Sequence, residues 1–379
     1  MRANDDKLQK EKPMITVMSN NLAPVLSRAV GIVKVRDMLP ILKCVMLTAD
    51  GGRLTIDANN LEMATRETIP ASEGSAKGCI DTVRLHAVVS KLPENSEIVM
   101  EFQEEALILK TKSSRIKLEM LSPSEFPVFS ESDYTAKFTM DGKDLAKALS
   151  HVIPFVSDEE TRFYLGGVNV RAVMNDKIIR FAASDGISLG VVRLPLSPEI
   201  NTPYDVIIPT RAIEELVKGL TDTPVKVSVS PHNVSFETNT RLLISKVIGS
   251  EYPDIERVIP TPGENIWCVD RAEFLNALGL ATAAARSERT IVVRIELSED
   301  KTTISVTSGP NDTVVEMDGA FSRYTGNPII TTFQSHLLER IVKLAAKMIE
   351  LRFDDDAKLF LARDVDDGTS VYVAMGRRG

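Results

Sequence analysis

Two aspartate-rich stretches near the end of the chain carry the side chains best suited to metal-assisted chemistry. The first, "DDD", spans Asp354 to Asp356, and the second, "DVDDG", spans Asp364 to Gly368. Paired carboxylates can hold a divalent cation, and the second stretch resembles the start of a calcium-binding loop. The loop pattern fails, because its glycine comes one position early and Met375 stands where the closing glutamate belongs. We therefore predict that both stretches are solvated turns.

Other metal ligands and nucleophiles are too scattered to form a local active site. The sequence contains no phosphate-binding loop, nucleophile elbow or zinc-protease motif. The histidines lie too far apart in the sequence for a local zinc site, and they are His86, His151, His232 and His336. The cysteines are odd in number and widely separated, which predicts reduced, buried thiols, and they are Cys44, Cys79 and Cys268. The sequence thus predicts a noncatalytic protein without a cofactor.

Length and composition indicate a soluble protein of several domains. A chain of 379 residues is too long for one ordinary core and suits two or three domains. It has no apolar run of about 18 residues, and its N-terminus lacks the apolar segment of a signal peptide. We therefore expect a cytoplasmic protein without a membrane partner. The net charge of −8 is, at first sight, unfavourable for binding nucleic acid.

Two amphipathic helix patterns each occur three times along the chain. The first is found in "NNLAPVLSRAV", "KDLAKALSHVI" and "AEFLNALGLAT", and the second in "VRLHAVVSKL", "TRAIEELVKGL" and "SHLLERIVKLA". Three short alternating runs follow each second helix, which is the pattern of antiparallel strands with one buried face. The sequence therefore predicts an α+β fold of three repeated domains, each with two helices packed on antiparallel sheets.

Proline-rich polar stretches mark the expected joints between the repeats. These joints run from Ser122 to Asp133 and from Tyr252 to Asn265. We predict a polar N-terminal extension (residues 1–13) and three domains (residues 14–133, 134–263 and 264–379).

Basic residues recur on the helix face that points away from the predicted core. A residue two positions from a core leucine lies about 200° around the helix axis. Arg28, His151 and Lys218 stand at this position, and the six helix segments together carry more basic than acidic side chains. Helix surfaces commonly carry Lys and Arg, which is the simpler explanation for any one helix. Six such helices side by side would form a positive surface that binds phosphates without reading sequence.

The third copy of the first helix departs from this pattern. Leu280 stands where the other copies have Arg28 and His151. We expect that this helix contributes positive charge through Arg286 and Arg289 instead.

Helix dimensions limit how such a surface could meet DNA. Six helices about 10 Å apart would close around an opening of roughly 9 Å, which is too narrow for a duplex. Twelve helices would leave roughly 28 Å, which is enough for a double helix about 20 Å wide. Two copies of the chain could therefore enclose DNA, whereas one could not.

Seven motifs, in order along the chain, resemble the bacterial DNA sliding clamp family, the β subunit of the DNA polymerase III holoenzyme. They are "RDMLPIL" (Arg36 to Leu42), "LSPSEFP" (Leu121 to Pro127), "TRFYLGGV" (Thr161 to Val168), "AASDGISL" (Ala182 to Leu189), "VIIP" (Val206 to Pro209), "EYPDIERVIP" (Glu251 to Pro260) and "SVYVAM" (Ser370 to Met375). The resemblance implies a head-to-tail homodimeric ring, with helices lining the hole and sheets outside. It implies a processivity factor that slides on double-stranded DNA. It also implies a peptide-binding pocket for the replicative polymerase catalytic subunit, the clamp loader and other clamp-binding proteins.

The resemblance also implies roles for individual residues. For the peptide pocket they are Leu165, Ser184, Gly186, Leu189, Pro253, Arg257, Val258, Val373, Ala374 and Met375. For DNA, the motifs imply Arg36, Phe163 and Tyr164, and helix phase and charge add Arg28, Lys91, Lys218, Arg340, Lys343 and Lys347. For the dimer interface, the residues are Ile116, Leu118, Ala284 and Ala285.

The chain departs from the family pattern at the rim of the expected pocket. Ile187 and Ser188 stand where the family often has His-Arg, and the C-terminus lacks the usual ending. Peptide preference therefore stays open. Two other functions also remain as alternatives: an adaptor that binds peptides without encircling DNA, and a metal-dependent nucleic-acid enzyme that uses the aspartate clusters.

Overall fold

The computed structural model describes residues 13–33, 38–128, 133–285, 290–354 and 356–376. The chain divides into two compact units. Unit 1 comprises Met1–Lys143 and Glu214–Val247, and unit 2 comprises Asp144–Ile213 and Ile248–Gly379. Two helices, α3 (Gly142–Val152) and α4 (Thr210–Val217), contribute residues to both units. Among the described residues, no helix is long and apolar enough to cross a membrane.

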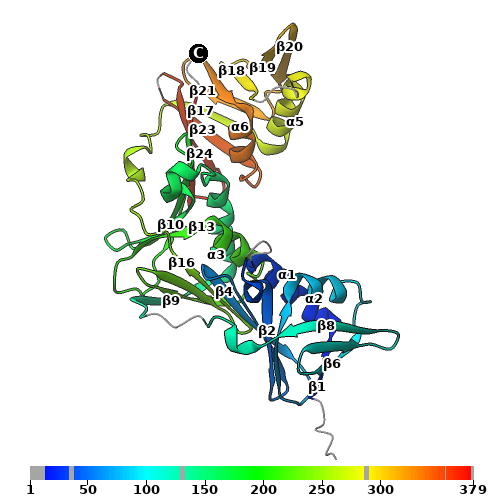
Figure 1. Ribbon diagram of the computed structural model, residues 1–379. Coiled ribbons are helices and arrows are strands. Elements are labelled where there is room, and N and C mark those ends of the chain that lie inside the picture. The colour runs from blue at the N-terminus through cyan, green and yellow to red at the C-terminus, as the bar shows by residue number, and fades with distance from the viewer. Residues whose placement is uncertain (1–12, 34–37, 129–132, 286–289, 355, 377–379) are drawn as a thin grey trace, which may run out of the picture. The chain divides into compact units, whose positions relative to one another are not determined.

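Unit 1 is built on one antiparallel sheet of twelve strands. In spatial order they are β1 (Met14–Met18), β6 (Glu97–Phe102), β7 (Ala106–Lys110), β8 (Arg115–Leu121), β5 (Ala76–Asp81), β2 (Cys44–Asp50), β3 (Arg53–Asn59), β4 (Met63–Pro70), β16 (Arg241–Lys246), β15 (Asn233–Glu237), β14 (Pro224–Val229) and β9 (Ala136–Asp141). The helices α1 (Ser19–Ile32) and α2 (Thr82–Val89) lie side by side in this unit (Figure 1). Short 3₁₀ turns, η1 (Pro40–Lys43) and η2 (Pro123–Glu125), complete it.

The packing of α1 follows from its apolar spacing. Leu22, Val25, Leu26 and Ala29 are buried, and their spacing of three and four residues places them on one face of a helix. This face packs on strands β3 and β4.

Unit 2 contains two antiparallel sheets. The nine-stranded sheet runs β13 (Asp205–Pro209), β10 (Gly167–Val173), β11 (Ile178–Ser184), β12 (Ser188–Pro195), β25 (Ser370–Met375), β24 (Leu359–Asp364), β23 (Met348–Phe353), β17 (Asn265–Asp270) and β21 (Ser322–Thr325). The four-stranded sheet runs β20 (Asn311–Met317), β19 (Thr302–Ser308), β18 (Val292–Leu297) and β22 (Ile329–Gln334). Its helices are α5 (Arg271–Thr282) and α6 (Ser335–Val342), and its 3₁₀ turns are η3 (Ile153–Phe155), η4 (Glu160–Leu165), η5 (Ile255–Arg257) and η6 (Ala283–Ala285).

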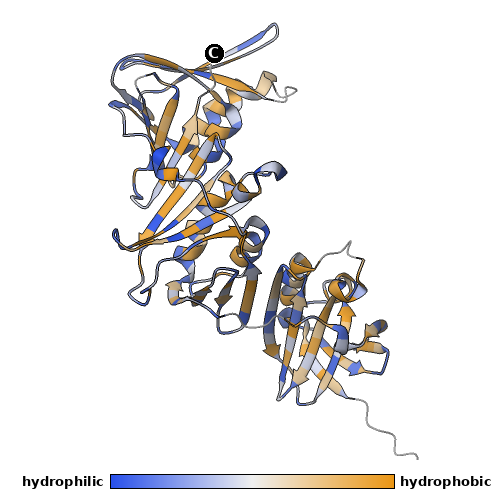
Figure 2. Cartoon of the chain, turned by 60° about the vertical axis from the view of Figure 1, so that its left-hand side comes forward, coloured by the Kyte–Doolittle hydropathy of each residue, from blue (hydrophilic) through white to orange (hydrophobic). Residues whose placement is uncertain are grey.

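Aromatic side chains form much of the core of unit 2. Phe333, Phe353 and Phe360 are fully buried and pack edge to face or tilted against one another. The only tryptophan, Trp267, is also buried, and its ring nitrogen donates a hydrogen bond to Ser322 Oγ over 2.8 Å. Figure 2 shows apolar residues along many of the strands and helices, interspersed with polar ones.

The α+β fold with repeated helix pairs on antiparallel sheets agrees with the prediction. The strands between the two helices of each repeat, such as β2 to β5, were not predicted. One reason is visible in β2, whose first four residues, Cys44 to Leu47, are all buried, so that the sequence forms a continuous apolar run without alternation.

The units do not coincide with the predicted domain boundaries at residues 133 and 263. Strands β9 and β14 to β16 belong to unit 1, because β16 pairs with β4. Strands β10 to β13 belong to unit 2, because β12 pairs with β25. The middle repeat therefore shares one sheet with each of its neighbours, and the three-domain boundaries stay a prediction.

Candidate functional site

A cavity of about 470 Å³ lies within unit 2, where segments far apart in the sequence meet. Its walls come from η4, the turn between β11 and β12, the segment around η5, and the ends of β24 and β25. The lining residues are Arg162, Tyr164, Leu165, Ser184, Gly186, Ile187, Ser188, Leu189, Tyr252, Pro253, Asp254, Ile255, Val258, Leu359, Val373 and Met375. Most are apolar, and several of them extend a buried cluster that contains Leu189, Ile255 and Val373.

The turn between β11 and β12 is fixed by its own side chains. Asp185 Oδ1 accepts hydrogen bonds from the backbone N–H groups of Ile187 (3.0 Å) and Ser188 (2.7 Å). Ser184 Oγ accepts one from the N–H of Gly186 over 3.1 Å. Gly186 has φ +90°, a conformation that other residues rarely adopt, and a Cβ there would approach Arg162 Nη1 to 2.5 Å. The turn therefore presents its backbone to the cavity without a side chain at residue 186.

The wall around η5 is held by an ion pair to the sheet. Arg180, whose side chain is almost fully buried on β11, contacts Glu256 Oε1 at 3.0 Å, and Arg193 on β12 contacts the other oxygen at 3.2 Å. Tyr252 lies beside the cavity, and burial raises the pKa of its phenol well above the ordinary value. The phenol is therefore protonated at neutral pH.

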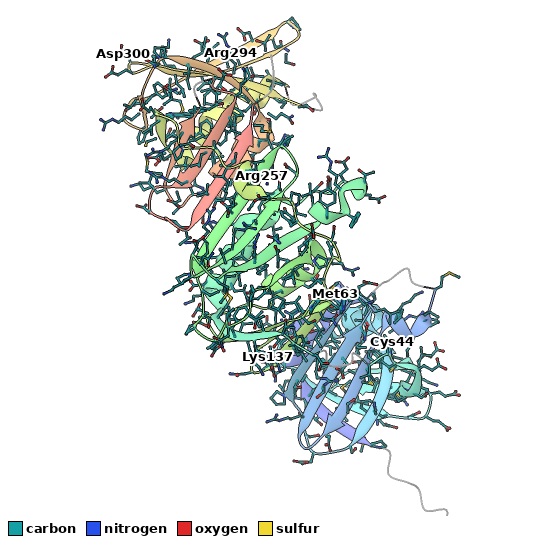
Figure 3. All side chains as sticks on the ribbon, turned by 90° about the vertical axis from the view of Figure 1, so that its left-hand side faces the viewer. Cys44, Met63, Lys137, Arg257, Arg294 and Asp300 are labelled. Atoms are coloured by element: carbon teal, nitrogen blue, oxygen red, sulfur yellow. The ribbon has the colours of Figure 1, made fainter. Side chains whose placement is uncertain are left out.

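The structure brings most of the predicted pocket residues together. Leu165, Ser184, Gly186, Leu189, Pro253, Val258, Val373 and Met375 all line the cavity. The prediction is wrong for Ala374, which is fully buried, because alternation along β25 turns it to the face opposite Val373 and Met375. Arg257 does not line the cavity either. Its side chain is 84% exposed at the surface of unit 2 and pairs with Asp254 Oδ2 at 3.1 Å (Figure 3).

Sequence reasoning missed several lining residues. Leu359 enters from β24 because that strand pairs with β25, which a motif search along one segment does not reveal. Tyr164, expected to face DNA, is half-buried and lines the cavity beside Leu165. Ile187 and Ser188, noted as departures from the family pattern, both contribute to the wall.

Arg28, which we expected to face DNA, is half-buried and paired with a carboxylate. Its Nε lies 2.9 Å from Glu67 Oε1 and its Nη2 lies 2.5 Å from Glu67 Oε2, and Glu67 is buried on β4. Arg241 from β16 contacts the same carboxylate at 3.3 Å. The helix phase was correct, but a strand supplies a buried anion that the guanidinium neutralises.

Arg340 is also not a free cation on a DNA-facing surface. Its side chain is only 18% exposed, and its Nη2 lies 2.8 Å from Asp185 Oδ2. Its Nη1 donates to the carbonyl of Pro154 over 2.7 Å. Likewise His151 is not an outward charge. Its Nδ1 lies 2.6 Å from the hydroxyl of Tyr372, and burial together with Lys147 lowers the pKa of its imidazole.

The other basic residues expected to face DNA remain accessible. Lys91, Lys218, Lys343 and Lys347 are exposed, as is Phe163. Lys218 pairs with Glu215 at 2.7 Å and Lys343 with Glu339 at 2.6 Å, each within one helical turn. Glu215 is buried and Glu339 is half-exposed, but in both pairs more than half of the lysine side chain stays accessible to solvent. Leu280 is exposed, as expected for the third copy of the first helix. Arg36, Arg286 and Arg289 lie outside the described residues.

Of the residues expected at the dimer interface, those on β8 lie on a strand with an open edge, whereas Ala285 is buried. β8 pairs with β7 along its length, but within the described chain it pairs with β5 only at Met120 and Leu121. Ile116 and Leu118 on this strand are half-buried, and Ala284 is exposed. The prediction of a contact through Ala285 is wrong, because η6 turns this residue into the core of unit 2.

Asp354 and the stretch Asp364 to Gly368 lie at turns, but the prediction that both stretches are solvated is wrong for Asp364, which is buried at the end of β24, and Asp355 lies outside the described residues. Asp354 Oδ1 accepts from the N–H groups of Lys358 and Leu359, and Asp364 Oδ2 accepts from the N–H of Ala346. Burial disfavours the ionised form of Asp367, yet hydrogen bonds from Thr369 and other donors hold its pKa well below its usual range. Within the described residues, no cluster of His, Cys, Asp and Glu could hold a metal ion.

The cysteines are free thiols in this structure. Burial raises the pKa of Cys44 to about 11 and that of Cys79 to about 12, so both are protonated at neutral pH. Cys268 is half-buried, and burial raises its pKa as well. These thiols are therefore poor nucleophiles and poor metal ligands.

Three family models match consecutive parts of the chain. They describe the N-terminal, central and C-terminal domains of the DNA polymerase III beta subunit, and they match residues 14–130, 139–254 and 256–378. Together with the repeated fold, they define a three-domain clamp with antiparallel sheets and helices. The chain belongs to the DNA polymerase III β subunit family, the bacterial β sliding clamps. It is accordingly a noncatalytic processivity subunit of the polymerase III holoenzyme.

Relatives of this chain match it over nearly their whole length. The beta sliding clamp of Caulobacter vibrioides is 29% identical over 377 residues, which cover 96% of this chain and 99% of the relative. That of Pseudomonas aeruginosa is 24% identical over 367 residues, with the same coverage. A crystal structure of the Caulobacter crescentus clamp has a TM-score of 0.89 at 27% identity, covering 97% of this chain and 99% of that one. A Bartonella birtlesii clamp bound to griselimycin also has a TM-score of 0.89, at 24% identity, and covers 97% and 100%.

Proposed function

We propose that two copies of this chain close head to tail into a ring around duplex DNA. We further propose that the cavity of unit 2 docks short linear peptides of the replicative polymerase catalytic subunit, the clamp loader and other clamp-binding proteins. Family membership supports the ring, and the cytoplasm is the expected compartment. The observation that carries the docking proposal is the cavity itself, because predicted residues from distant segments converge on its walls.

The chemistry of the cavity favours an apolar peptide. Leu165, Leu189 and Val373 present aliphatic surface, and Met375 stands half-exposed at the rim. An apolar side chain that leaves water for this surface gains about 25 cal/mol per Å² of buried area. Polar groups of the turn lie beside this surface, although the Ser184 hydroxyl is itself used to donate to the Ser188 carbonyl and to accept from the Gly186 N–H. Such a site selects an extended segment with one or two large apolar anchors.

Binding is tested with a peptide selected by the protein itself. A random decapeptide library is panned against the intact chain, and the tightest binder is labelled with fluorescein. Fluorescence anisotropy then gives its Kd, and the bound complex is crystallised. We expect the peptide in the unit 2 cavity. A peptide bound elsewhere, or no enrichment at all, would contradict the docking proposal.

Exposed lysines support contact with the DNA backbone. Lys91, Lys218, Lys343 and Lys347 offer charges that could meet phosphates without reading sequence. Encirclement has a topological test, in which the chain is loaded by a clamp loader onto nicked circular DNA and the circle is then cut. A ring slides off the free ends, so retention of the protein on the linear product would contradict the encircling model.

The edge of β8 supports the proposed contact between copies. Arg115, Lys117 and Glu119 direct their backbone groups away from β7, and an open strand edge is a ready template for another chain. Sedimentation equilibrium is the direct measurement. A homodimer is expected, and replacement of Lys117 by proline should shift it towards monomer, because the Lys117 N–H points away from β7 and proline cannot donate to an inter-chain ladder.

A further inference from the structure

We infer that Arg340, on α6, is a positioning residue for the peptide-docking cavity, which it serves by locking the turn between β11 and β12. This inference rests on the proposed docking function. The turn supplies Ser184, Gly186, Ile187, Ser188 and Leu189 to the cavity wall. Arg340 itself does not line the cavity, so its effect on a peptide must act through the turn.

The guanidinium of Arg340 bridges the turn to the segment that follows α3. One nitrogen, Nη2, lies 2.8 Å from Asp185 Oδ2 and also donates to Ser188 Oγ. The other, Nη1, donates to the carbonyl oxygen of Pro154 over 2.7 Å. A planar group with donors in a fixed fork suits this task, whereas a lysine ammonium could not span both partners in the same geometry.

Asp185 divides its two oxygens between the turn and the arginine. Oδ1 holds the N–H groups of Ile187 and Ser188, and Oδ2 receives Arg340. The Ser188 hydroxyl also contacts both oxygens at 2.9 Å. The position of Arg340 therefore determines where the carboxylate sits, and the carboxylate determines where the turn backbone sits.

Two stacked aromatic rings, those of Phe155 and Tyr372, hold the guanidinium of Arg340 in place. The guanidinium carbon lies 4.9 Å from the centre of the Phe155 ring, and this ring stacks on Tyr372 at 5.6 Å. Phe155 is fully buried against β12, where a Cβ on Gly190 would approach its ring to 2.4 Å. A cation held over a buried aromatic face is attracted by the ring electrons and loses freedom of movement. The arginine thus joins α6, η3 and the turn into one rigid assembly.

Unit 1 contains the same turn without an arginine. Asn60 Oδ1 accepts from the N–H groups of Glu62 (2.9 Å) and Met63 (2.8 Å), as Asp185 does in unit 2. The amide of Asn60 then donates directly to the carbonyl of Ile32 at the end of α1, over 2.7 Å. A neutral side chain can therefore hold this turn to the end of the preceding helix. The charged pair in unit 2 is a second solution, in which Asp185 needs Arg340.

The test uses the selected decapeptide and four variants of the intact chain. Arg340→Met leaves the Asp185 carboxylate without its partner, and we expect its Kd to rise at least tenfold. Arg340→Lys retains a charge but loses the bridge, and an intermediate rise of about threefold is expected. The control, Arg294→Met, removes an arginine from a half-exposed ion pair with Glu296 on β18 and should leave the Kd unchanged.

The double variant Asp185→Asn with Arg340→Met separates positioning from general packing. It imitates Asn60, so the turn regains a neutral cap and the Kd should return to within about threefold of the wild type. If Arg340 merely packs α6 against Phe155, the double variant will bind as weakly as Arg340→Met, and the inference is overturned. It is also overturned if Arg340→Met binds as tightly as the wild type. Failure of the wild type itself to bind in this cavity would instead remove the proposed docking function.

Discussion

Each unit has a cavity where a pair of antiparallel strands meets a later segment of the chain, and the two cavities differ greatly in volume. In unit 1, the adjoining ends of β3 and β4 meet the segment after η2, and in unit 2 the turn between β11 and β12 meets the segment around η5. The turns between these strands both place a residue with positive φ at the same position, Leu61 at +72° and Gly186 at +90°. Phe126 and Pro127 line the first cavity as Tyr252 and Pro253 line the second.

The cavities differ in volume because the side chains at their base, here called the floor, are charged in unit 1 and apolar in unit 2. Counting strand pairs back from each turn, Asp57 and Arg66 in unit 1 occupy the positions of Ala182 and Val191 in unit 2. Asp57 and Arg66 form an ion pair of 2.7 Å, and the volume there is about 90 Å³ rather than about 470 Å³. An apolar peptide that covered this pair would have to desolvate it at a cost of several kcal/mol. The same backbone therefore yields a docking cavity only where the floor is apolar.

The largest expected difference comes from a charge placed in each wall. Val258→Asp puts a carboxylate beside the apolar lining of unit 2, and Val128→Asp does the same at unit 1. Both valines are more than half exposed, so both variants should fold. We expect Val258→Asp to raise the Kd of the selected decapeptide about 30-fold or more, equivalent to roughly 2 kcal/mol. Val128→Asp should leave it unchanged, and equal effects would show that the two cavities are not functionally distinct.

Substitutions at the two positions with positive φ should have smaller effects, and their effects on stability should have opposite signs. Gly186→Ala forces a side chain into a positive-φ position and against Arg162, so we expect a loss of about 1 kcal/mol in stability and a several-fold rise in Kd. Leu61→Gly relieves the same conformation in unit 1, for a gain of about 0.5–1 kcal/mol. Urea unfolding of both variants measures the signs. A stabilising Gly186→Ala would mean that the turn is not strained as described.

The sequence predicted where the cavity residues lie better than it predicted which way charged helix residues point. Leu165, Leu189 and Val373 could be placed from motifs, and for Leu189 and Val373 strand alternation then fixes which way the side chain points. Alternation also explains the miss at Ala374, which has the opposite phase to its two neighbours.

The ion pairs of Arg28 and Arg340 were not predicted, for a different reason. A helical wheel gives the direction of a side chain but not what another layer places there. Glu67 on β4 and Asp185 in the turn lie far away in the sequence, and each is buried or half-buried where an arginine can reach it. Only the three-dimensional structure shows that these cations are used inside the protein. Lys218 and Lys343 remain exposed because each pairs with a glutamate one turn away, which leaves the ammonium group accessible to solvent.

The smallest expected effect concerns the floor of unit 1 and its dependence on pH. Burial raises the pKa of Asp57, and Arg66 only partly opposes this. A carboxyl group whose pKa is raised by folding adds stability below its unfolded value of about 3.9 and loses that contribution as the pH rises through the folded value. Asp57→Asn removes this ionisation while retaining the shape of the side chain. The variant should therefore unfold at a slightly higher temperature than the wild type at pH 7, by a degree or two for a gain of about 0.5 kcal/mol, and the gain should disappear towards pH 3.5.

Thermal unfolding across this range is the measurement, with Asp300→Asn, an exposed aspartate on unit 2, as the matched control. A lower unfolding temperature for Asp57→Asn at pH 7 would mean that the pairing with Arg66 outweighs desolvation, and the polar floor would then be a stabilising feature of the cavity that does not dock peptide.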